Sequence, residues 1–282
     1  MERKNLVSIY IPTYNRCALL KRAIDSVLSQ TYKPIELIVV DNGSTDDTVA
    51  YLKSMEMGKG IKVIYLADNF GACYARNKAI ELASGTYITG LDDDDFFAEN
   101  RIEQFFESYK YHNTPIFSND SLLLNNGKSK YIKKRKTVYY QDLLKFNYIG
   151  NQLFTLRKDY LDAGKFDESL ESGQDYDMWF KILRLRGFAK NTNTITQIMD
   201  ASYEGTRISM SPKKKRGYFK LYKKYKNEMK ARHKKLHLLR IKYQTGDGIS
   251  LKIFLKLFYF GDFKYLTIIF IRSVLLKKRI KM

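Results

Sequence analysis

Four adjacent aspartates, Asp92–Asp95, are the residues of this sequence best suited to chemistry. Neighbouring carboxylates repel one another, and a bound cation relieves that repulsion. Their oxygens suit hard divalent ions such as Mg²⁺ and Mn²⁺, and Mg²⁺ typically combines one or two carboxylates with phosphate oxygens of a substrate. The cluster therefore predicts a divalent cation beside a phosphate-bearing ligand. The alternative is a solvated acidic turn that begins the following helix.

Polar residues follow two further apolar, strand-like runs. The three runs are Leu6–Ile11 before Pro12, Thr13 and Tyr14; Ile35–Val40 before Asp41 and Asn42; and Thr86–Leu91 before the four aspartates. In open parallel sheets, ligands bind beyond the carboxyl ends of the strands. We therefore expect these three sets of residues to converge on one edge of a sheet.

The elements that would position these residues alternate between strand and helix. Apolar residues at helical spacing cover Leu19–Gln30, Asp46–Met55 and Ala72–Ala83, and a further strand is expected at Ile61–Leu66. This alternation predicts an α/β fold with a mostly parallel sheet flanked by helices.

The pattern is looser beyond Arg101. The expected elements there are helices at Arg101–Tyr111, Tyr140–Phe146 and Asp175–Arg186, strands at Gln152–Arg157 and Thr194–Tyr203, a basic loop or hairpin at Lys128–Lys136, and a long basic helical stretch at Lys213–Tyr243.

Four segments together resemble family 2 glycosyltransferases in both order and spacing. They are Val7–Arg16, Val39–Thr48, Ala75–Asn77 and Tyr87–Asp95. The resemblance covers roughly residues 6–210. It implies a GT-A fold, a nucleotide-sugar donor such as a UDP-sugar, and transfer with inversion at the anomeric carbon.

The resemblance also implies roles for individual residues. Pro12, Thr13, Tyr14, Asp41 and Asn42 would line the uracil and ribose pocket, with Arg76, Asp92 and Asp93 also at the nucleotide-sugar. Asp94 would ligate Mn²⁺ or Mg²⁺ on the diphosphate. The family usually has a second aspartate where Asn42 stands, and an amide would pair with the base as both donor and acceptor.

The segment Gly173–Trp179 resembles the motif that carries the general base of the family. Asp175 matches the base, and Gln174 stands where a glutamate is usual. An inverting transfer needs one base, to take the proton of the attacking acceptor hydroxyl. The alternative for Asp175 is a carboxylate that stabilises a helix N-terminus. Trp179 fits a core tryptophan better than a sugar-stacking one, and Tyr203 occupies the position of a histidine that often binds metal in the family.

Two further segments, Ile149–Thr155 and Ser211–Lys214, are similar to a narrower group of bacterial O-antigen hexosyltransferases. These act on HexNAc-diphosphate-undecaprenol. The resemblance implies transfer of one glucose or galactose to lipid-linked GlcNAc or GalNAc, most simply as a β-1,3 linkage.

Positive charge is concentrated at the C-terminal end of the chain. The net charge is +20, and residues 212–282 hold 22 Lys and Arg against three acidic residues. We expect residues 1–211 to form the glycosyltransferase domain and residues 212–282 a basic amphipathic helical extension. Basic and apolar residues alternate through Ile249–Phe260, as in helices that lie at a membrane surface. A core-packing helix is the alternative, and His233 and His237 are expected on a solvated basic face.

Composition excludes several classes of protein. Two cysteines, Cys17 and Cys73, cannot build a disulfide framework, and no run of about 18 uncharged apolar residues predicts a spanning helix. The N-terminal segment is too short and polar for a secretory signal. We therefore expect a cytoplasmic enzyme, peripheral on the inner face of the bacterial inner membrane.

Two other functions remain compatible with parts of the pattern. A nucleotidyltransferase would keep the acidic cluster but would not need Asp175. A basic nucleic-acid-binding module would explain the charge alone. Because the acidic cluster and Asp175 fit a transferase, we expect no nucleic-acid partner.

Overall fold

The computed structural model describes residues 5–124, 126–200 and 213–243. The chain packs as two units. The first comprises Met1–Ser169 and Gln174–Gly205, and the second comprises Leu170–Gly173 and Thr206–Met282. The predicted boundary near residue 211 stays a prediction.

The first sheet has the strand order β3-β2-β1-β4-β9. Its strands are β1 (Val7–Thr13), β2 (Ile35–Asp41), β3 (Lys62–Tyr65), β4 (Tyr87–Gly90) and β9 (Thr155–Leu156). The first four are parallel to their neighbours, and only β9 is antiparallel. The mostly parallel sheet predicted from the sequence is therefore confirmed.

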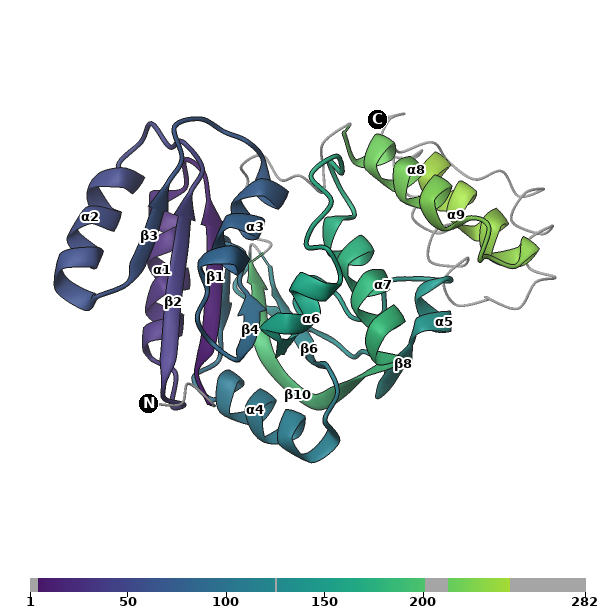
Figure 1. Ribbon diagram of the computed structural model, residues 1–282, viewed down its shortest axis with the longest axis horizontal. Helices are drawn as coiled ribbons and strands as arrows, with labels where there is room; N and C mark the ends of the chain where they lie inside the picture. The colour runs from purple at the N-terminus through teal and green to yellow at the C-terminus, as the bar shows by residue number, and fades with distance from the viewer. Residues whose placement is uncertain (1–4, 125, 201–212, 244–282) are drawn as a thin grey trace. The chain divides into compact units, whose positions relative to one another are not determined.

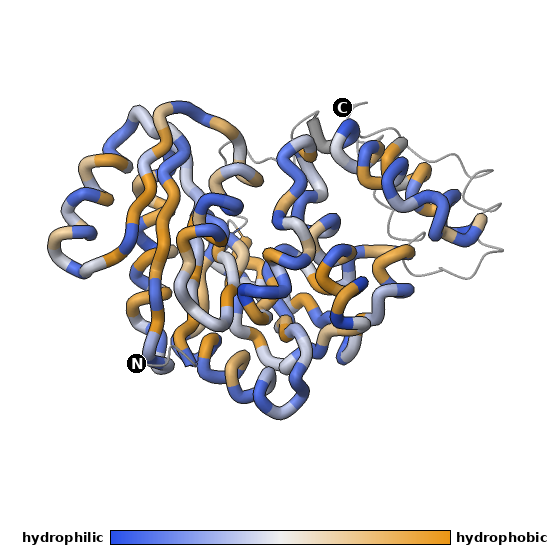
Figure 2. The backbone as a smooth tube through the Cα atoms, in the orientation of Figure 1, coloured by the Kyte–Doolittle hydropathy of each residue, from blue (hydrophilic) through white to orange (hydrophobic). Residues whose placement is uncertain are grey.

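Helices cover both faces of this sheet (Figure 1). They are α1 (Cys17–Leu28), α2 (Thr48–Lys59), α3 (Ala72–Leu82) and α4 (Arg101–His112). Val7, Ile9 and Ile11 point to one face and share a buried cluster with residues of α1 and α4. Strands β1 and β2 are mostly hydrophobic along their length (Figure 2), as expected for strands buried on both sides.

A second sheet has the order β5-β10-β6-β7, with β8 also paired to β10. Its strands are β5 (Asp95–Phe97), β6 (Ile116–Leu123), β7 (Ser129–Ile132), β8 (Thr137–Tyr139) and β10 (Phe188–Asp200). Strand β4 of the first sheet ends at Gly90 and β5 begins at Asp95. Asp92, Asp93 and Asp94 therefore lie on the short link between the two sheets, and Asp95 is the first residue of β5.

Three short or medium helices complete the first unit: α5 (Tyr140–Leu143), α6 (Arg157–Asp162) and α7 (Gln174–Arg186). In the second unit, α8 (Lys213–Tyr225) and α9 (Ala231–Tyr243) pack on each other. Gly217 lies so close to Ser172 that a Cβ would collide with its backbone. His233 and His237 are buried, so the prediction of a solvated histidine face was wrong.

Several element boundaries differ from the predicted ones. Helix α2 begins at Thr48, two residues later than predicted, and the Asp46 carboxylate accepts the Thr48 N–H as N-capping side chains do. Strand β10 begins at Phe188, since the polar residues before Thr194 pair with β6 and β8. The stretch 213–243 forms two helices, and the predicted strand at 152–157 has only two residues.

Candidate active site

The carboxylate of Asp93 is held by the loop after β1. Thr13 donates a hydrogen bond to it at 2.8 Å, and Arg16 donates one at 2.9 Å. Asp93 is buried, and burial raises the pKa of its carboxyl to about 6, although Arg16 and Thr13 act to lower it. The expected meeting of the first and fourth strand ends is therefore found at this pair of residues.

Asp92 faces another partner, the guanidinium of Arg76 on α3. Arg76 donates to Asp92 at 2.9 Å and to the Oε1 of Gln174 at 2.7 Å. Gln174 is the first residue of α7. One buried arginine thus joins the acidic cluster to the helix that carries the predicted base.

Asp95 is buried, as Asp93 is. It accepts hydrogen bonds from the amides of Asn151 at 3.1 Å and Gln197 at 2.9 Å. Burial, reinforced by Asp92 and Asp94, raises the pKa of its carboxyl well above the usual value. Asp95 therefore has a structural place at the start of β5.

Asp94 keeps a partly exposed side chain and lies 3.5 Å from Arg16. Among the described residues, no group of three or more His, Cys, Asp or Glu side chains could hold a metal ion. A divalent cation here would therefore need substrate and water oxygens for most of its ligands. Such a set suits Mg²⁺, which is commonly bound through one or two carboxylates and substrate phosphates.

Asp175 lies in the first turn of α7, where the helix dipole favours a negative charge. Burial raises the pKa of its carboxyl to about 7, with Arg76 acting to lower it and Asp92 to raise it. A carboxyl that titrates near neutral pH can accept a proton at physiological pH. The structure thus places the predicted base beside Arg76 and the acidic cluster.

The remaining predicted residues lie at the ends of β1 and β2. Tyr14 is exposed, Pro12 is partly buried, and Asp41 accepts hydrogen bonds from the Ser44 N–H. Asn42 donates to Asn69 and accepts from the Phe70 N–H, so its amide shapes the loop before α3. The nucleotide-binding roles of these residues stay predictions, and Tyr203 lies outside the described residues.

Sequence reasoning missed the loop that closes the cluster on one side, residues 147–152. Asn151 donates to both Asp92 and Asp95, at 3.0 and 3.1 Å. Trp179 Nε1 donates to the Gly150 carbonyl at 2.8 Å and is fully buried. Trp179 is therefore a core residue, as predicted, and it fastens this loop to α7. The only signal in the sequence was the segment around Asn151, whose partners are distant along the chain.

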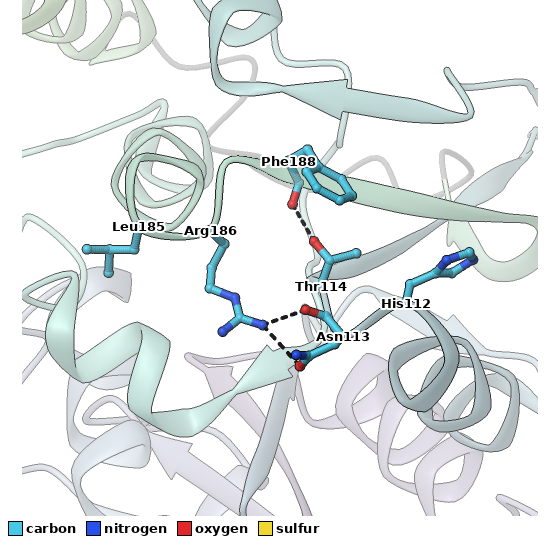
Figure 3. A pocket seen from close by; sticks show the side chains of 6 residues that line it. All are labelled: His112, Asn113, Thr114, Leu185, Arg186 and Phe188. Carbon is cyan, nitrogen blue, oxygen red and sulfur yellow. Dashed lines mark hydrogen bonds between the residues drawn. The ribbon is translucent and has the colours of Figure 1, made fainter.

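A hollow of about 350 Å³ lies elsewhere in the first unit, lined by His112, Asn113, Thr114, Leu185, Arg186 and Phe188 (Figure 3). Arg186 donates to the Asn113 carbonyl at 2.7 Å, and Thr114 donates to the Phe188 carbonyl at 2.6 Å. These bonds join the turn after α4 to the turn after α7. The hollow is at the end of α7 opposite Asp175, and Arg186 in its lining is roughly 16 Å from Asp175 along the helix at about 1.5 Å per residue. It is therefore separate from the acidic cluster.

Comparison with known proteins defines the class. Residues 8–163 match the family described as Glycosyl transferase family 2, and the chain belongs to this family. It is 35% identical over 262 residues to WcaA of Escherichia coli (strain K12), named for colanic acid biosynthesis, covering 88% of this chain and 90% of that protein. It is 34% identical over 190 residues to TuaG of Bacillus subtilis (strain 168), named for teichuronic acid biosynthesis, covering 66% of this chain and 74% of that one.

Solved structures share the fold at low sequence identity. TarS 1–349 of S. aureus in complex with UDP-GlcNAc has a TM-score of 0.68 at 17% identity, covering 95% of this chain and 79% of that chain. The mannosyltransferase PcManGT of Pyrobaculum calidifontis, in complex with GDP-Man and Mn²⁺, has a TM-score of 0.56 at 15% identity, covering 96% and 73%. The predicted GT-A fold is confirmed.

Proposed function

We propose that this chain is an inverting, metal-dependent glycosyltransferase that moves one hexose from a UDP-sugar to a lipid-linked sugar. The observation that carries the proposal is the path from Asp175 through Arg76 to Asp92. Asp175, whose carboxyl titrates near neutral pH, thus lies beside an acidic cluster that is suited to a nucleotide diphosphate. A nucleotidyltransferase would not need the carboxyl of Asp175.

The residues of the site would have separate roles in the reaction. Asp175 would accept the proton of the acceptor hydroxyl as that hydroxyl attacks the anomeric carbon. Arg76, buried between Asp92 and Gln174, would keep Asp175 ionised at working pH and fix the start of α7. Thr13 and Arg16 would hold Asp93 toward the nucleotide. A divalent cation at Asp94, when bound, would supply charge stabilisation for the departing diphosphate.

The names of the relatives support a place in surface polysaccharide synthesis. WcaA and TuaG are named for colanic and teichuronic acid biosynthesis, and the TarS structure was determined with UDP-GlcNAc. PcManGT was determined with Mn²⁺. The proposed donor is UDP-glucose or UDP-galactose, the acceptor GlcNAc- or GalNAc-diphosphate-undecaprenol, and the linkage β-1,3.

The proposed location is the cytoplasmic face of the inner membrane, with residues 212–282 as a membrane-associated extension. Among the described residues, no helix is long and apolar enough to cross a bilayer. The +19 charge of the extension matches the anionic lipids of that leaflet.

One assay tests the proposal. Purified full-length protein is incubated with Mn²⁺, a synthetic GlcNAc- or GalNAc-diphosphate-lipid, and either UDP-glucose or UDP-galactose, and the product is followed by mass. We expect a gain of one hexose from one donor, a β-anomeric product by NMR, and loss of turnover in EDTA that Mn²⁺ restores. Absence of product across this panel, or an α-anomeric product, would overturn the proposal.

A further inference from the structure

A second basic surface lies on the first unit, in the segment 128–136, here called the basic arm. It contains Lys128, Lys130, Lys133, Lys134, Arg135 and Lys136. No acidic residue lies between positions 121 and 141, whereas the rest of residues 1–211 hold 22 basic and 27 acidic residues. The segment 128–136 therefore has a net charge of +6, whereas the rest of residues 1–211 has a net charge of −5.

Four of the five lysines of the arm face solvent. Lys128, Lys130, Lys133 and Lys136 are exposed, and among the described residues none of these four forms an ion pair. Strand β7 pairs with β6 alone within the described sheet, so it is an edge strand. Tyr131, between two of these lysines, is 49% exposed. An edge with four unneutralised lysines and an exposed aromatic ring presents a surface for an anionic partner.

The arm is also fastened to the wall of the candidate active site. Lys134, unlike its neighbours, is largely buried: its Nζ pairs with Asp120 at 2.6 Å and donates to the Ile149 carbonyl at 2.8 Å. Ile149 is two residues before Asn151, which bonds to Asp92 and Asp95. Lys134 therefore connects the arm, through the 147–152 loop, to the acidic cluster.

We propose that the basic arm docks the catalytic unit on an anionic membrane surface. Each lysine near such a surface strengthens binding by roughly fivefold, and a tyrosine ring sits favourably at headgroup level. The inference rests on the proposed function in one respect, since a lipid-linked acceptor requires the active site to lie near a bilayer. It is independent of residues 212–282, to which the sequence alone assigned membrane binding.

The test uses the full-length protein and two variants with equal loss of charge. The arm variant carries Lys128→Gln, Lys130→Gln, Lys133→Gln and Lys136→Gln. The control variant carries Gln at four exposed lysines elsewhere on the same unit, namely Lys33, Lys53, Lys59 and Lys158. Cosedimentation is measured with phosphatidylcholine vesicles and with vesicles of 70% phosphatidylcholine and 30% phosphatidylglycerol, in 150 mM salt.

We expect the arm variant to need at least tenfold more anionic lipid for half-maximal binding, and the control variant less than threefold more. Both should unfold at the wild-type temperature, since all eight lysines are on the surface. An equal effect of the two variants would overturn the proposal. So would binding of the arm to duplex DNA at this salt without binding to the anionic vesicles.

A second measurement separates this proposal from the proposed function. With a short-chain, water-soluble GlcNAc-diphosphate acceptor, the arm variant should keep its turnover within about twofold of wild type while losing vesicle binding. If wild type shows no transferase activity but the arm still governs vesicle binding, the docking surface stands and the proposed function fails. Loss of turnover with the soluble acceptor would show that the arm acts in the site rather than on the membrane.

Discussion

The four adjacent aspartates have the same type of side chain but lie in four different environments. They are Asp92, Asp93, Asp94 and Asp95. Asp92 faces Arg76, Asp93 faces Thr13 and Arg16, and Asp95 is enclosed by two amides. Asp94 lies 3.5 Å from Arg16, and its side chain, like that of Asp92, is partly exposed. The hydrogen-bond partners of the aspartates come from β1, α3, the 147–152 loop and β10. The different environments of the four side chains therefore depend on tertiary structure and cannot be derived from the sequence Asp92–Asp95 alone.

The clearest prediction at this scale concerns Asp175. Its carboxyl must be ionised to accept a proton, and its pKa is about 7. The kcat/KM should therefore fall as pH decreases below about 7, and Arg76→Gln should move this limb to higher pH, because Arg76 lowers the pKa. Asp175→Asn should reduce kcat by about 10²- to 10⁴-fold.

Calorimetry of UDP-sugar binding distinguishes a base from a binding residue. Asp175→Asn should leave the Kd for the donor within about threefold of wild type. Asp162→Asn, on the exposed end of α6, serves as the control and should change neither kcat nor the Kd for the donor. Transfer by Asp175→Asn at more than a tenth of the wild-type rate would remove Asp175 from the role of base.

Asn151 is predicted to be a positioning residue, because its amide separates two carboxylates that would otherwise face each other. Asn151→Asp would add a third carboxylate to Asp92 and Asp95. We expect this variant to lose about 1–3 kcal/mol of unfolding free energy at pH 8. The loss should diminish as pH falls, because protonation of the crowded carboxyls removes their repulsion.

The pH dependence makes the Asn151 experiment specific. Urea unfolding of Asn151→Asp and Asn151→Ala is compared at pH 8 and pH 5.5. The alanine variant lacks the added charge, so its stability difference from wild type should change much less between the two pH values. Equal pH dependence of the two variants would contradict the electrostatic role of Asn151.

At the scale of elements, the sequence predicted what is set by local pattern. The runs at β1, β2 and β4 are apolar over consecutive residues, and helical spacing follows each of the first two, so their order and the parallel sheet could be derived. The second sheet could not. Strand β10 pairs with β5 about 100 residues earlier, and its polar stretch around Asn191 resembles a loop until Asn119 is placed beside it.

The same distinction applies to the candidate site. Thr13, Arg76 and Asp175 belong to continuous motifs and were predicted from them. Asn151 and Gln197 act through single amides whose partners lie 46 to 102 residues away. No spacing along the chain marks such residues, because only the fold brings them to the carboxylates.

Glu36 shows how the other end of the sheet is held. Its carboxylate accepts hydrogen bonds from Ser8 at 2.5 Å, from the Ser84 N–H at 2.8 Å and from the Ser84 hydroxyl at 2.6 Å, and it pairs with Lys62. Burial acts to raise its pKa, but the bonds from Lys62, Ser8 and Ser84 outweigh burial and lower it to about 2. Glu36 thus links β1, β2, β3 and the turn before β4.

Glu36→Gln should lower the free energy of unfolding by about 1–3 kcal/mol at pH 7. Because the folded-state pKa is depressed, the stabilisation is fully present above the unfolded pKa of about 4.3 and is lost as pH falls toward about 2. The difference from wild type in urea unfolding should therefore shrink between pH 5 and pH 3. As a control, Glu107→Gln removes an exposed ion pair and should lower the free energy of unfolding by less than about 0.5 kcal/mol. A constant Glu36→Gln difference across this range would contradict the linkage.

At the scale of the whole molecule, positive charge occurs in two places that are far apart in sequence. One is the basic arm of residues 128–136, and the other is the segment 212–282 with its charge of +19. Outside these two segments the chain is net acidic, with 22 basic and 27 acidic residues. Each basic segment carries the kind of charge that an anionic membrane surface attracts.

This arrangement predicts that the two segments contribute independently to membrane binding. Deletion of residues 249–282 should lower the fraction recovered on vesicles with 30% phosphatidylglycerol, and the arm variant should lower it further. Their effects on the logarithm of the partition coefficient should add when each segment engages the lipid separately. Raising salt from 150 to 500 mM should weaken all forms and narrow the differences among them, since exposed charges are screened. An unchanged membrane fraction after the deletion would mean that residues 249–282 pack into the protein, and the arm would then account for the binding alone.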